Sequence, residues 1–249
     1  MTSEVLGIDV GGSSVKAGLV DIEAGRVNGE LISAPTPRPS TPPAVMQAVA
    51  GLAARLPGPT GTVGIAFPSV IKHGIVRTAA NIDSSWLGTD GAALAARTLG
   101  RPALLLNDAD AAGIAEMRWG AGRGSNGVVI MVTLGTGIGT ALFCDGRLLP
   151  NTELGHLELR GMDAEKWASA QVRTVERLDF PAWIARVNEY LQRLHDLFWP
   201  DVFILGGAVS ERFAEFAQLL RSPAVLRPAH FAGQAGVVGA AMAAAESSR

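Results

Sequence analysis

The sequence predicts an α/β fold in which short buried strands alternate with helices, and three observations support this. Apolar runs of strand length occupy residues 62–68 and 103–106, and each ends in a turn or in polar residues. Apolar residues at helical spacing mark residues 180–198. A strand, a glycine turn and a second strand recur at 4–21 and 127–145, near the start of each half of the chain.

The length of 249 residues allows one large domain or two small ones. We expect a small α/β domain over 1–106, on which the terminal segment 236–249 packs back, and a large α/β domain over 107–235. The proline-rich stretch 34–43 is expected to form a loop. The expected strands are 4–9, 15–21, 27–33, 62–68, 103–106 and 201–205, besides the hairpin at 127–145. The expected helices are 44–55, 94–99, 109–119, 166–177, 180–198, 210–220 and 236–246.

Composition and charge exclude several classes of protein. The 21 basic and 23 acidic side chains give a net charge of -2, which argues against a generic nucleic-acid binder. The single cysteine, Cys144, excludes a disulfide framework and a cysteine-based zinc site. Residues 124–144 carry no charge, but their glycines favour two short strands over a membrane span. With no basic or apolar leader at the start, we expect a cytoplasmic protein that binds neither membrane nor nucleic acid.

The first candidate site is the glycine turn that follows the first strand. Glycines let the backbone approach a phosphate, and their N–H groups can point at its oxygens. An aspartate at the end of the strand can hold Mg2+ through water. A plain tight hairpin is the alternative interpretation of the same residues. The candidates are Asp9, Gly11, Gly12, Ser13, Ser14 and Lys16.

A second glycine turn contains Gly135, Thr136, Gly137 and Gly139. Three glycines at alternate positions exceed what one tight turn requires. The pattern lacks the GK[ST] of a P-loop, and a strand rather than a helix follows it, so it is not a dinucleotide fingerprint. We therefore expect a second phosphate-binding turn, with an ordinary turn as the alternative.

Asn107 and Asp108 follow the buried strand 103–106. A carboxylate at the carboxyl end of a strand in an α/β protein is well placed for chemistry. Such a carboxylate can accept the proton of a hydroxyl that attacks phosphorus. The competing interpretation is a helix cap, formed by Asp108 or by Asp110.

Glu153 and His156 stand at a spacing at which a carboxylate and an imidazole can clamp neighbouring sugar hydroxyls. Two further carboxylates, Glu158 and Glu165, follow them. Neither a second histidine nor a cysteine is near, so we expect no zinc at this place.

The order of these elements is more specific than any one of them. GIDVGGSSVKAGLVD, NDAD, TLGTGIGTALFCDG, ELGH and ILGGAVS together resemble the ROK family of sugar kinases, and the similarity covers nearly the whole chain. FPSVIKHGIVRTAANIDSSW, LLLNDADAAGIAEMRWGAG and TLGTGIGTALFCDGRLLPNTELGHLEL are most similar to the family members that use polyphosphate. The resemblance implies an actin/hexokinase-like (ribonuclease H-like) α/β fold of two lobes with a cleft between the lobes.

Three departures from the family pattern matter. The family's zinc-binding cysteine cluster, CxCGxxGC, is absent, and residues 161–166 stand in its place, as in the members that use polyphosphate. The helix-turn-helix extension of the family is also missing, which argues against a repressor. Trp167, within KWASAQ, matches no role known from the family.

The resemblance implies roles for single residues. Asp9 helps to hold Mg2+, the two glycine turns hold the donor phosphates, and Asp108 is the general base toward the sugar 6-hydroxyl. Glu165 is the third sugar carboxylate, with Glu158 as the alternative. The residues implied around the sugar are Asn107, Asp108, Glu153, His156, Glu165, Asn81 and Ser69.

We therefore expect an enzyme that moves the terminal phosphoryl group of inorganic polyphosphate to glucose, giving glucose 6-phosphate, with Mg2+ and without zinc. ATP, alone or beside polyphosphate, is the alternative donor, and Gly206-Gly207 would then serve its adenosine or merely connect a strand to a helix. A non-catalytic sugar sensor is the third hypothesis. The resemblance favours a homodimer. A basic track for a polyanion, with ordinary surface charges as the alternative, would consist of Lys16, Arg118, Arg123 and Arg147.

Overall fold

The computed structural model describes residues 4–247, and these residues form two compact units. The first unit contains the chain up to Arg118 together with the segment from Gln234 onward, and the second contains Trp119–Gly233. The expected boundary between 106 and 107 lies before the helix α3 (Asp108–Trp119), whereas the structure keeps almost all of that helix in the first unit. Both units are α/β, so the fold class expected from the sequence is confirmed.

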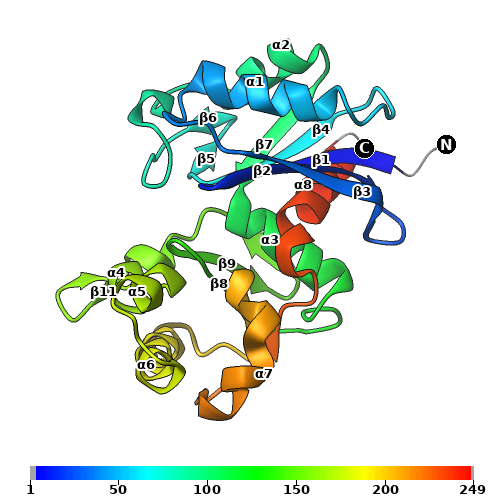
Figure 1. Cartoon of the computed structure of the whole chain (residues 1–249). Helices are drawn as coiled ribbons and strands as arrows, with labels where there is room; N and C mark the ends of the chain where they lie inside the picture. Colours follow the sequence, from blue (N-terminus) through cyan, green and yellow to red (C-terminus); the bar gives the residue numbers. More distant parts are fainter. Residues whose placement is uncertain (1–3, 248–249) are drawn as a thin grey trace. The chain divides into compact units, whose positions relative to one another are not determined.

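A five-stranded sheet forms the centre of the first unit (Figure 1). Its strands lie in the order β3-β2-β1-β4-β7; the first three form an antiparallel meander, and the last two run parallel to β1. The strands are β1 (Glu4–Val10), β2 (Ser14–Asp21), β3 (Arg26–Pro35), β4 (Val63–Phe67) and β7 (Ala103–Asn107). The helices α1 (Pro42–Ala53) and α2 (Gly91–Leu99) cover one face, and α8 (Ala235–Ser247) covers the other.

Alternation along β1 explains why its two faces receive different helices. Successive side chains of a strand point to opposite faces of the sheet. Ile8 and Val10 therefore share a core with Val45 and Met46 of α1. Gly7, between the larger residues, points to α8 and leaves room for its backbone.

The second unit repeats the strand pattern of the first. Its sheet has the order β10-β9-β8-β13-β14, in which β8, β9 and β10 are antiparallel neighbours and β13 and β14 run parallel to β8. The strands are β8 (Val128–Leu134), β9 (Ile138–Cys144), β10 (Arg147–Leu149), β13 (Val202–Gly206) and β14 (Val225–Pro228). The strand–glycine–strand pattern that recurs in the sequence thus begins a repeated sheet.

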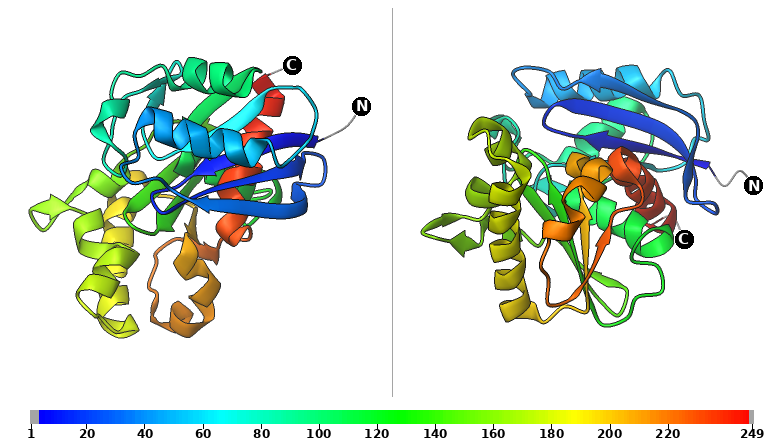
Figure 2. Two further views of the ribbon diagram at one scale, coloured as in Figure 1. Left: turned by 45° about the horizontal axis from the view of Figure 1, so that its top comes forward. Right: turned by 60° about the horizontal axis from the view of Figure 1, so that its bottom comes forward.

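The long helix α6 (Phe180–Phe198) packs along the second sheet (Figure 2). Its buried residues Trp183, Val187 and Leu191 share a core with Ile130 and Val132 of β8. Its expected range, 180–198, is confirmed, because its apolar residues keep one helical period throughout. Asp179 caps its first turn by accepting the N–H of Ala182 at 2.9 Å.

Two expected helices differ from the structure. The range 166–177 breaks into α4 (Glu165–Ala168) and α5 (Ala170–Val175), because Ser169 is extended and its hydroxyl accepts the N–H of Val172. The range 210–220 contains only the short helix α7 (Phe213–Phe216), flanked by 3-10 turns at Ala208–Arg212 and Ala217–Leu219. The remaining elements are β5 (Ile71–Lys72), β6 (Ile75–Val76), β11 (Glu158–Leu159), β12 (Met162–Asp163) and the 3-10 turns Ser84–Trp86, Leu154–His156 and Ala232–Gln234.

None of the helices within residues 4–247 combines the length and the apolar character that a membrane span requires.

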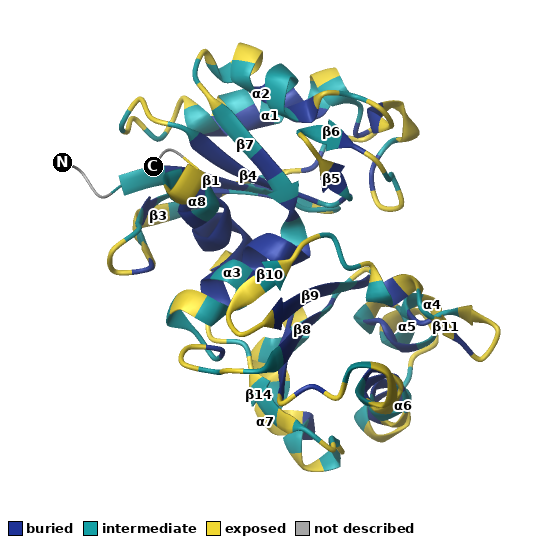
Figure 3. Cartoon of the chain, turned by 180° about the vertical axis from the view of Figure 1, so that it is seen from behind, coloured by how far each residue is buried: buried dark blue, intermediate teal, exposed yellow. Residues whose placement is uncertain are grey.

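The backbone of α8 approaches the first sheet and α3 unusually closely. A Cβ atom built on Gly64 would lie 1.8 Å from the carbonyl oxygen of Ala240, and one on Gly7 would lie 2.0 Å from that of Val237. On the helix itself, a Cβ on Gly239 would lie 1.6 Å from the carbonyl oxygen of Ala111 in α3. Figure 3 shows most of α8 as buried, apart from its exposed C-terminal end. Only glycine fits at these three contacts.

Gly64→Ala tests this packing. We expect the free energy of unfolding to fall by about 3 kcal/mol, because the added methyl group must push the backbone of α8 away from β4. Gly51→Ala is the matched control, since Gly51 is exposed within α1 with nothing near its Cβ position; it should stabilise by about 0.5–1 kcal/mol. Urea denaturation measures both. A Gly64→Ala protein as stable as the wild type would contradict the close approach of α8.

Candidate active site

The first glycine turn joins β1 to β2 and keeps its predicted residues together. Asp9 lies opposite Lys16 in the antiparallel pair, one residue before the end of β1. The turn is closed by a hydrogen bond from the N–H of Gly11 to the carbonyl oxygen of Ser14 at 2.9 Å. Gly12 and Ser13 form its tip, and Ser13 is exposed. The strand-end carboxylate and the glycine turn are therefore adjacent, as expected from the sequence.

The surroundings of Asp9 raise the pKa of its carboxyl group from 3.8 to about 6. Burial is the larger cause, because it disfavours the ionised form, and the positive charge of Lys16 acts in the opposite direction. Gly236, at the start of α8, contributes to this burial. A Cβ built on Gly236 would lie 2.7 Å from Cγ of Asp9, so the glycine leaves the carboxylate its place.

Asn107 and Asp108 stand where β7 ends and α3 begins. The side-chain oxygen of Asn107 accepts the N–H of Asp110 at 3.0 Å, and its amide donates to the carbonyl oxygen of Ser69 at 3.2 Å. The competing interpretation placed the helix cap at Asp108 or Asp110. In the structure Asn107 takes the capping position, because the helix begins at Asp108. Asp108 is half-buried, and its Oδ1 accepts the N–H of Ala109 at 2.9 Å.

Asn81, the remaining sugar candidate of the first unit, is exposed. Its main-chain carbonyl oxygen lies 3.8 Å from where a Cβ on Gly12 would stand, so it borders the first glycine turn.

The second glycine turn, between β8 and β9, is held by neighbours on several sides. The N–H of Gly135 donates to the carbonyl oxygen of Gly137 at 3.0 Å, and the carbonyl oxygen of Gly135 accepts the N–H of Gln171 at 3.1 Å. Thr136 is exposed at the tip, and Gly139 already belongs to β9. The turn therefore exists as expected, with three of its four predicted residues outside the strands.

Two further glycines pack directly against this second turn. A Cβ on Gly207 would lie 2.4 Å from the carbonyl oxygen of Leu134, and the residue has a φ of +86° that favours glycine. A Cβ on Gly155 would lie 2.1 Å from the carbonyl oxygen of Ile138. The glycines of the ILGG and ELGH motifs thus have a packing role on either side of the turn.

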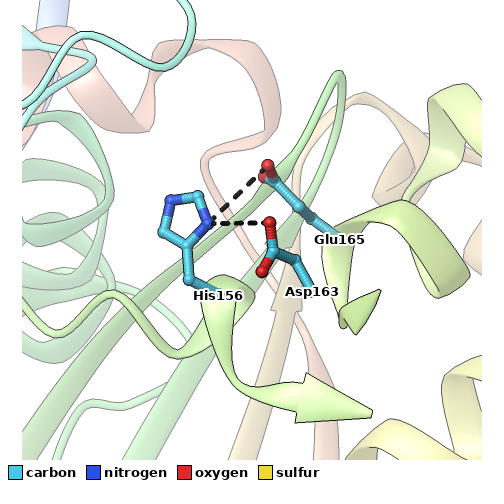
Figure 4. Close-up of side chains that lie close together, drawn as sticks. All are labelled: His156, Asp163 and Glu165. Carbon is cyan, nitrogen blue, oxygen red and sulfur yellow. Dashed lines mark ion pairs between the residues drawn. The ribbon is translucent and has the colours of Figure 1, made fainter. Parts of the chain in front are cut away.

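Three carboxylates surround His156, and two of them were candidates. Figure 4 shows two of the three, those of Asp163 and Glu165. Glu153 Oε2 lies 3.7 Å from Nε2, Asp163 Oδ2 lies 3.7 Å from Nδ1, and Glu165 Oε1 lies 3.9 Å from Nδ1. Glu165 also accepts the N–H of Ile138 through Oε2 at 3.4 Å, so it connects this cluster to the second turn. The competing candidate, Glu158, is exposed in β11, and the geometry favours Glu165.

Electrostatics differ among these carboxyl groups. Burial raises the pKa of Glu153, the His156 side chain opposes this shift, and the charge of Glu165 adds to it. Lys166, whose Nζ lies 2.9 Å from Oδ2 of Asp163, lowers the pKa of Asp163 through a hydrogen bond. Nothing in the sequence around Asp163 pointed to this place in the cluster, because β12 is only two residues long.

One ligand atom each of His156, Asp163 and Glu165 lies within 4.8 Å of the others, close enough for all three to contact one small polar ligand or cation.

Trp167 anchors the short helix α4, which carries Glu165. Its indole N–H donates to Glu189 of α6 at 3.2 Å. The guanidinium carbons of Arg186 and Arg160 lie 4.0 and 5.1 Å from the centre of its ring, at distances typical of cation–π contacts. Arg160 is in turn paired with Glu189. The tryptophan that matched no family role therefore ties the segment with Glu165 to α6.

Of the expected basic track, Lys16 lies beside Asp9, whereas Arg118, Arg123 and Arg147 are exposed.

Comparison with known proteins agrees with this fold. The repeated five-stranded sheets define an actin/hexokinase-like protein of the kind found in sugar kinases. Residues 5–171 match the ROK family, and the chain belongs to that family.

Several relatives are similar over most of the chain. A polyphosphate glucokinase of Mycobacterium tuberculosis (strain CDC 1551 / Oshkosh) is 44% identical over 95% of this chain and 89% of its own. The solved structure of an inorganic polyphosphate/ATP-glucomannokinase from Arthrobacter sp. strain KM is 45% identical, with a TM-score of 0.96 over 98% of this chain and 99% of its own. A ROK family glucokinase from Streptomyces griseus, solved with glucose and AMPPNP, is 25% identical, with a TM-score of 0.82 over 98% and 99% of the two chains.

The raised pKa of Asp9 predicts how replacing its carboxyl group changes the pH dependence of the protein's stability. The folded protein binds a proton at Asp9 below about pH 6, whereas the unfolded chain releases it near 3.8, so this group's contribution to stability falls as pH rises between the two values. The substitution Asp9→Asn removes this fall in stability, because an amide does not titrate. With a chelator present, we expect the stability of Asp9→Asn relative to the wild type to increase by about 2 kcal/mol from pH 4.5 to pH 7.5.

Urea denaturation at the two pH values measures this difference. Glu23→Gln, at an exposed carboxylate, is the control and should show no such change. An equal effect of Asp9→Asn at both pH values would show that the carboxyl group of Asp9 is not perturbed by burial.

Proposed function

We propose that the protein transfers the terminal phosphoryl group of inorganic polyphosphate to the 6-hydroxyl of glucose. The observation that supports this most strongly is its similarity, at 44% identity over 95% of the chain, to a polyphosphate glucokinase. Both glycine turns and the Asn107-Asp108 strand end lie within residues 5–171, which match the ROK family.

In the proposed reaction, Asp108 accepts the proton of the sugar 6-hydroxyl while the oxygen attacks the terminal phosphorus. The new bond joins this oxygen to phosphorus, the bridging P–O bond breaks, and the polyphosphate leaves one unit shorter. The hydrogen bond from the Ala109 N–H fixes the orientation of the Asp108 carboxylate. Positioning of this kind, rather than covalent chemistry, is the main task of a protein in phosphoryl transfer.

The glycine turns bind the donor in this proposal. The first turn, Gly11–Ser14 with Lys16, and the second, Gly135–Gly137 with Gly139, present main-chain N–H groups to phosphate oxygens. Such donors offset the charge on the moving group without having to reorganise.

Asp9 is the residue that would hold Mg2+, through water. Its hard carboxylate suits this ion, and Gly236 leaves the group its place beside the first turn. When bound, the ion offsets negative charge on the phosphoryl group.

Sugar hydroxyls are assigned to Asn107 and Asn81 in the first unit and to Glu153, His156 and Glu165 in the second. The pairing of an imidazole with carboxylates supplies both donors and acceptors, which a hydroxyl can use in either direction.

ATP is the second candidate donor, because the name of the Arthrobacter relative includes ATP as well as polyphosphate. A sensor that binds sugar without turnover is less favoured, since such a protein has no need of both Asp9 and Asp108. We further propose a cytoplasmic homodimer.

Asp108→Asn tests the general base. We expect kcat to fall by about 100-fold or more, since an amide cannot accept the proton, while folding is retained because the side-chain oxygen can still accept the Ala109 N–H. Asp90→Asn, at the cap of α2, is the matched control and should keep wild-type kcat. A coupled assay for glucose 6-phosphate gives the result. Near-normal turnover in Asp108→Asn would exclude this assignment.

The choice of donor is tested by comparing rates with long-chain polyphosphate and with ATP at equal glucose. We expect polyphosphate to be preferred and its rate to fall more steeply with added salt, because many weak charge contacts are screened together. Faster turnover with ATP would reverse the order of donors. Tight glucose binding without transfer from either donor would identify a sensor instead.

A further inference from the structure

The segment just after β3, expected only to be a proline-rich loop, lies against the first glycine turn. Thr36 is buried, at 7% exposure, although it lies between two prolines. Arg38 is exposed, but its guanidinium reaches the turn. Both residues belong to the first unit, as does the turn.

Three successive carbonyl groups of the turn are held by this segment. The Thr36 hydroxyl donates to the carbonyl oxygen of Gly11 at 2.6 Å. Arg38 donates through Nη2 to the carbonyl oxygen of Gly12 at 2.9 Å. The main-chain N–H of Thr36 donates to the carbonyl oxygen of Ser13 at 3.1 Å. The turn is therefore held in place through its carbonyl oxygens, which leaves its N–H groups out of these contacts.

Peptide planarity gives this arrangement a consequence. In a trans peptide the C=O of one residue and the N–H of the next point in opposite directions. Because the three carbonyls face Thr36 and Arg38, the N–H groups of Gly12, Ser13 and Ser14 are directed to the opposite side of the turn. Successive N–H groups directed to one side form a concavity that binds anions.

The segment is itself firmly held. The hydroxyl of Ser40 accepts the N–H of Asp83 at 3.1 Å, and the carbonyl oxygen of Ser40 accepts the indole N–H of Trp86 at 2.8 Å. Trp86 is fully buried. The contacts to the turn therefore come from a rigid part of the first core rather than from a free loop.

We propose that Thr36 and Arg38 are positioning residues for the donor: they hold the first glycine turn so that its N–H groups face a phosphate. This rests on the proposed function, in which that turn binds donor phosphate. Neither side chain is a phosphate ligand, because both act from the carbonyl side. Each hydrogen bond to a carbonyl also polarises its peptide, which makes the N–H on the far side a stronger donor.

The test compares Thr36→Val, which keeps the shape of the side chain but removes its hydroxyl, with Thr36→Ser, which keeps the hydroxyl, and with Arg38→Ala. Binding of tripolyphosphate with Mg2+ is measured by calorimetry without glucose, and KM for polyphosphate and for glucose is measured by the coupled assay. We expect Thr36→Val and Arg38→Ala to weaken tripolyphosphate binding and raise KM for polyphosphate by about threefold to tenfold. KM for glucose should stay unchanged, and Thr36→Ser should behave as the wild type.

Two variants with the same chemistry elsewhere in the first unit are controls. The hydroxyl of Thr98 donates to the carbonyl oxygen of Leu94 at 2.9 Å, and Nη1 of Arg101 donates to that of Pro59 at 2.6 Å. Thr98→Val and Arg101→Ala should leave tripolyphosphate binding unchanged.

The outcomes separate this proposal from the function on which it rests. If the wild-type protein binds tripolyphosphate but transfers nothing to glucose, the proposed function is excluded. The positioning role is then still supported if Thr36→Val binds tripolyphosphate more weakly than the wild type. Unchanged tripolyphosphate affinity in Thr36→Val, or an equal rise in both KM values, would overturn the positioning role, as would a wild type that does not bind tripolyphosphate. If Thr36→Val does not fold, Arg38→Ala decides, because Arg38 is exposed: an unchanged affinity overturns the proposal.

Discussion

The first unit depends on how closely the backbone of α8 can approach β1, β4 and α3. Glycines on both sides of the contact permit it: Gly7 and Gly64 on the strands, and Gly239 on the helix. Because six of the nine buried residues of the helix are alanine or glycine, it can lie nearly on the sheet. The same approach places Gly236 beside Asp9. A helix more than 200 residues away in the sequence thus lies against that carboxylate, whose pKa is raised by burial.

The second unit uses close glycine contacts in a different place. Gly155 and Gly207 approach the two strands that border its glycine turn, so the ELGH and ILGG motifs are needed for packing before any ligand is considered. The segment that replaces the cysteine cluster is held without cysteines. Trp167, stacked against Arg186 and bonded to Glu189, ties it to α6. Such contacts order a short helix that could not persist alone.

Strong local periodicity made much of this fold predictable, and tertiary contacts decided the rest. The two strand–glycine–strand patterns and the helix Phe180–Phe198 follow directly from spacing. The break at Ser169 did not, because the apolar spacing continues across it and only the serine's capping bond reveals the interruption. Likewise, Asn107 rather than an aspartate caps α3, since the helix starts one residue earlier than its apolar pattern. The expected boundary between 106 and 107 separated α3 from the first sheet because the contact of Ala111 with Gly239 has no local signal.

The candidate site shows the same division between local and distant signals. Asp9, Asp108 and the glycine turns stand out because each ends or interrupts an apolar strand pattern, and His156 stands out through its spacing from Glu153. Asp163 and Thr36 do not, since one lies in a two-residue strand and the other between prolines. Their places are known only from the groups that they contact in the folded chain.

The two glycine turns, although they follow equivalent strands, are held by groups of different charge. The first is held through its carbonyls by a neutral hydroxyl and a cationic guanidinium, from Thr36 and Arg38. The second is held at its end through the N–H of Ile138, which donates to the carboxylate of Glu165. A negative charge at that point disfavours a phosphate beside Ile138. The N–H of Gly135 is also engaged within the turn, so Thr136 and Gly137 are the residues there best placed to meet an anion. In the proposed function, the groups that hold the turns therefore favour phosphate at the first turn, and the second turn would contribute over a shorter stretch of backbone.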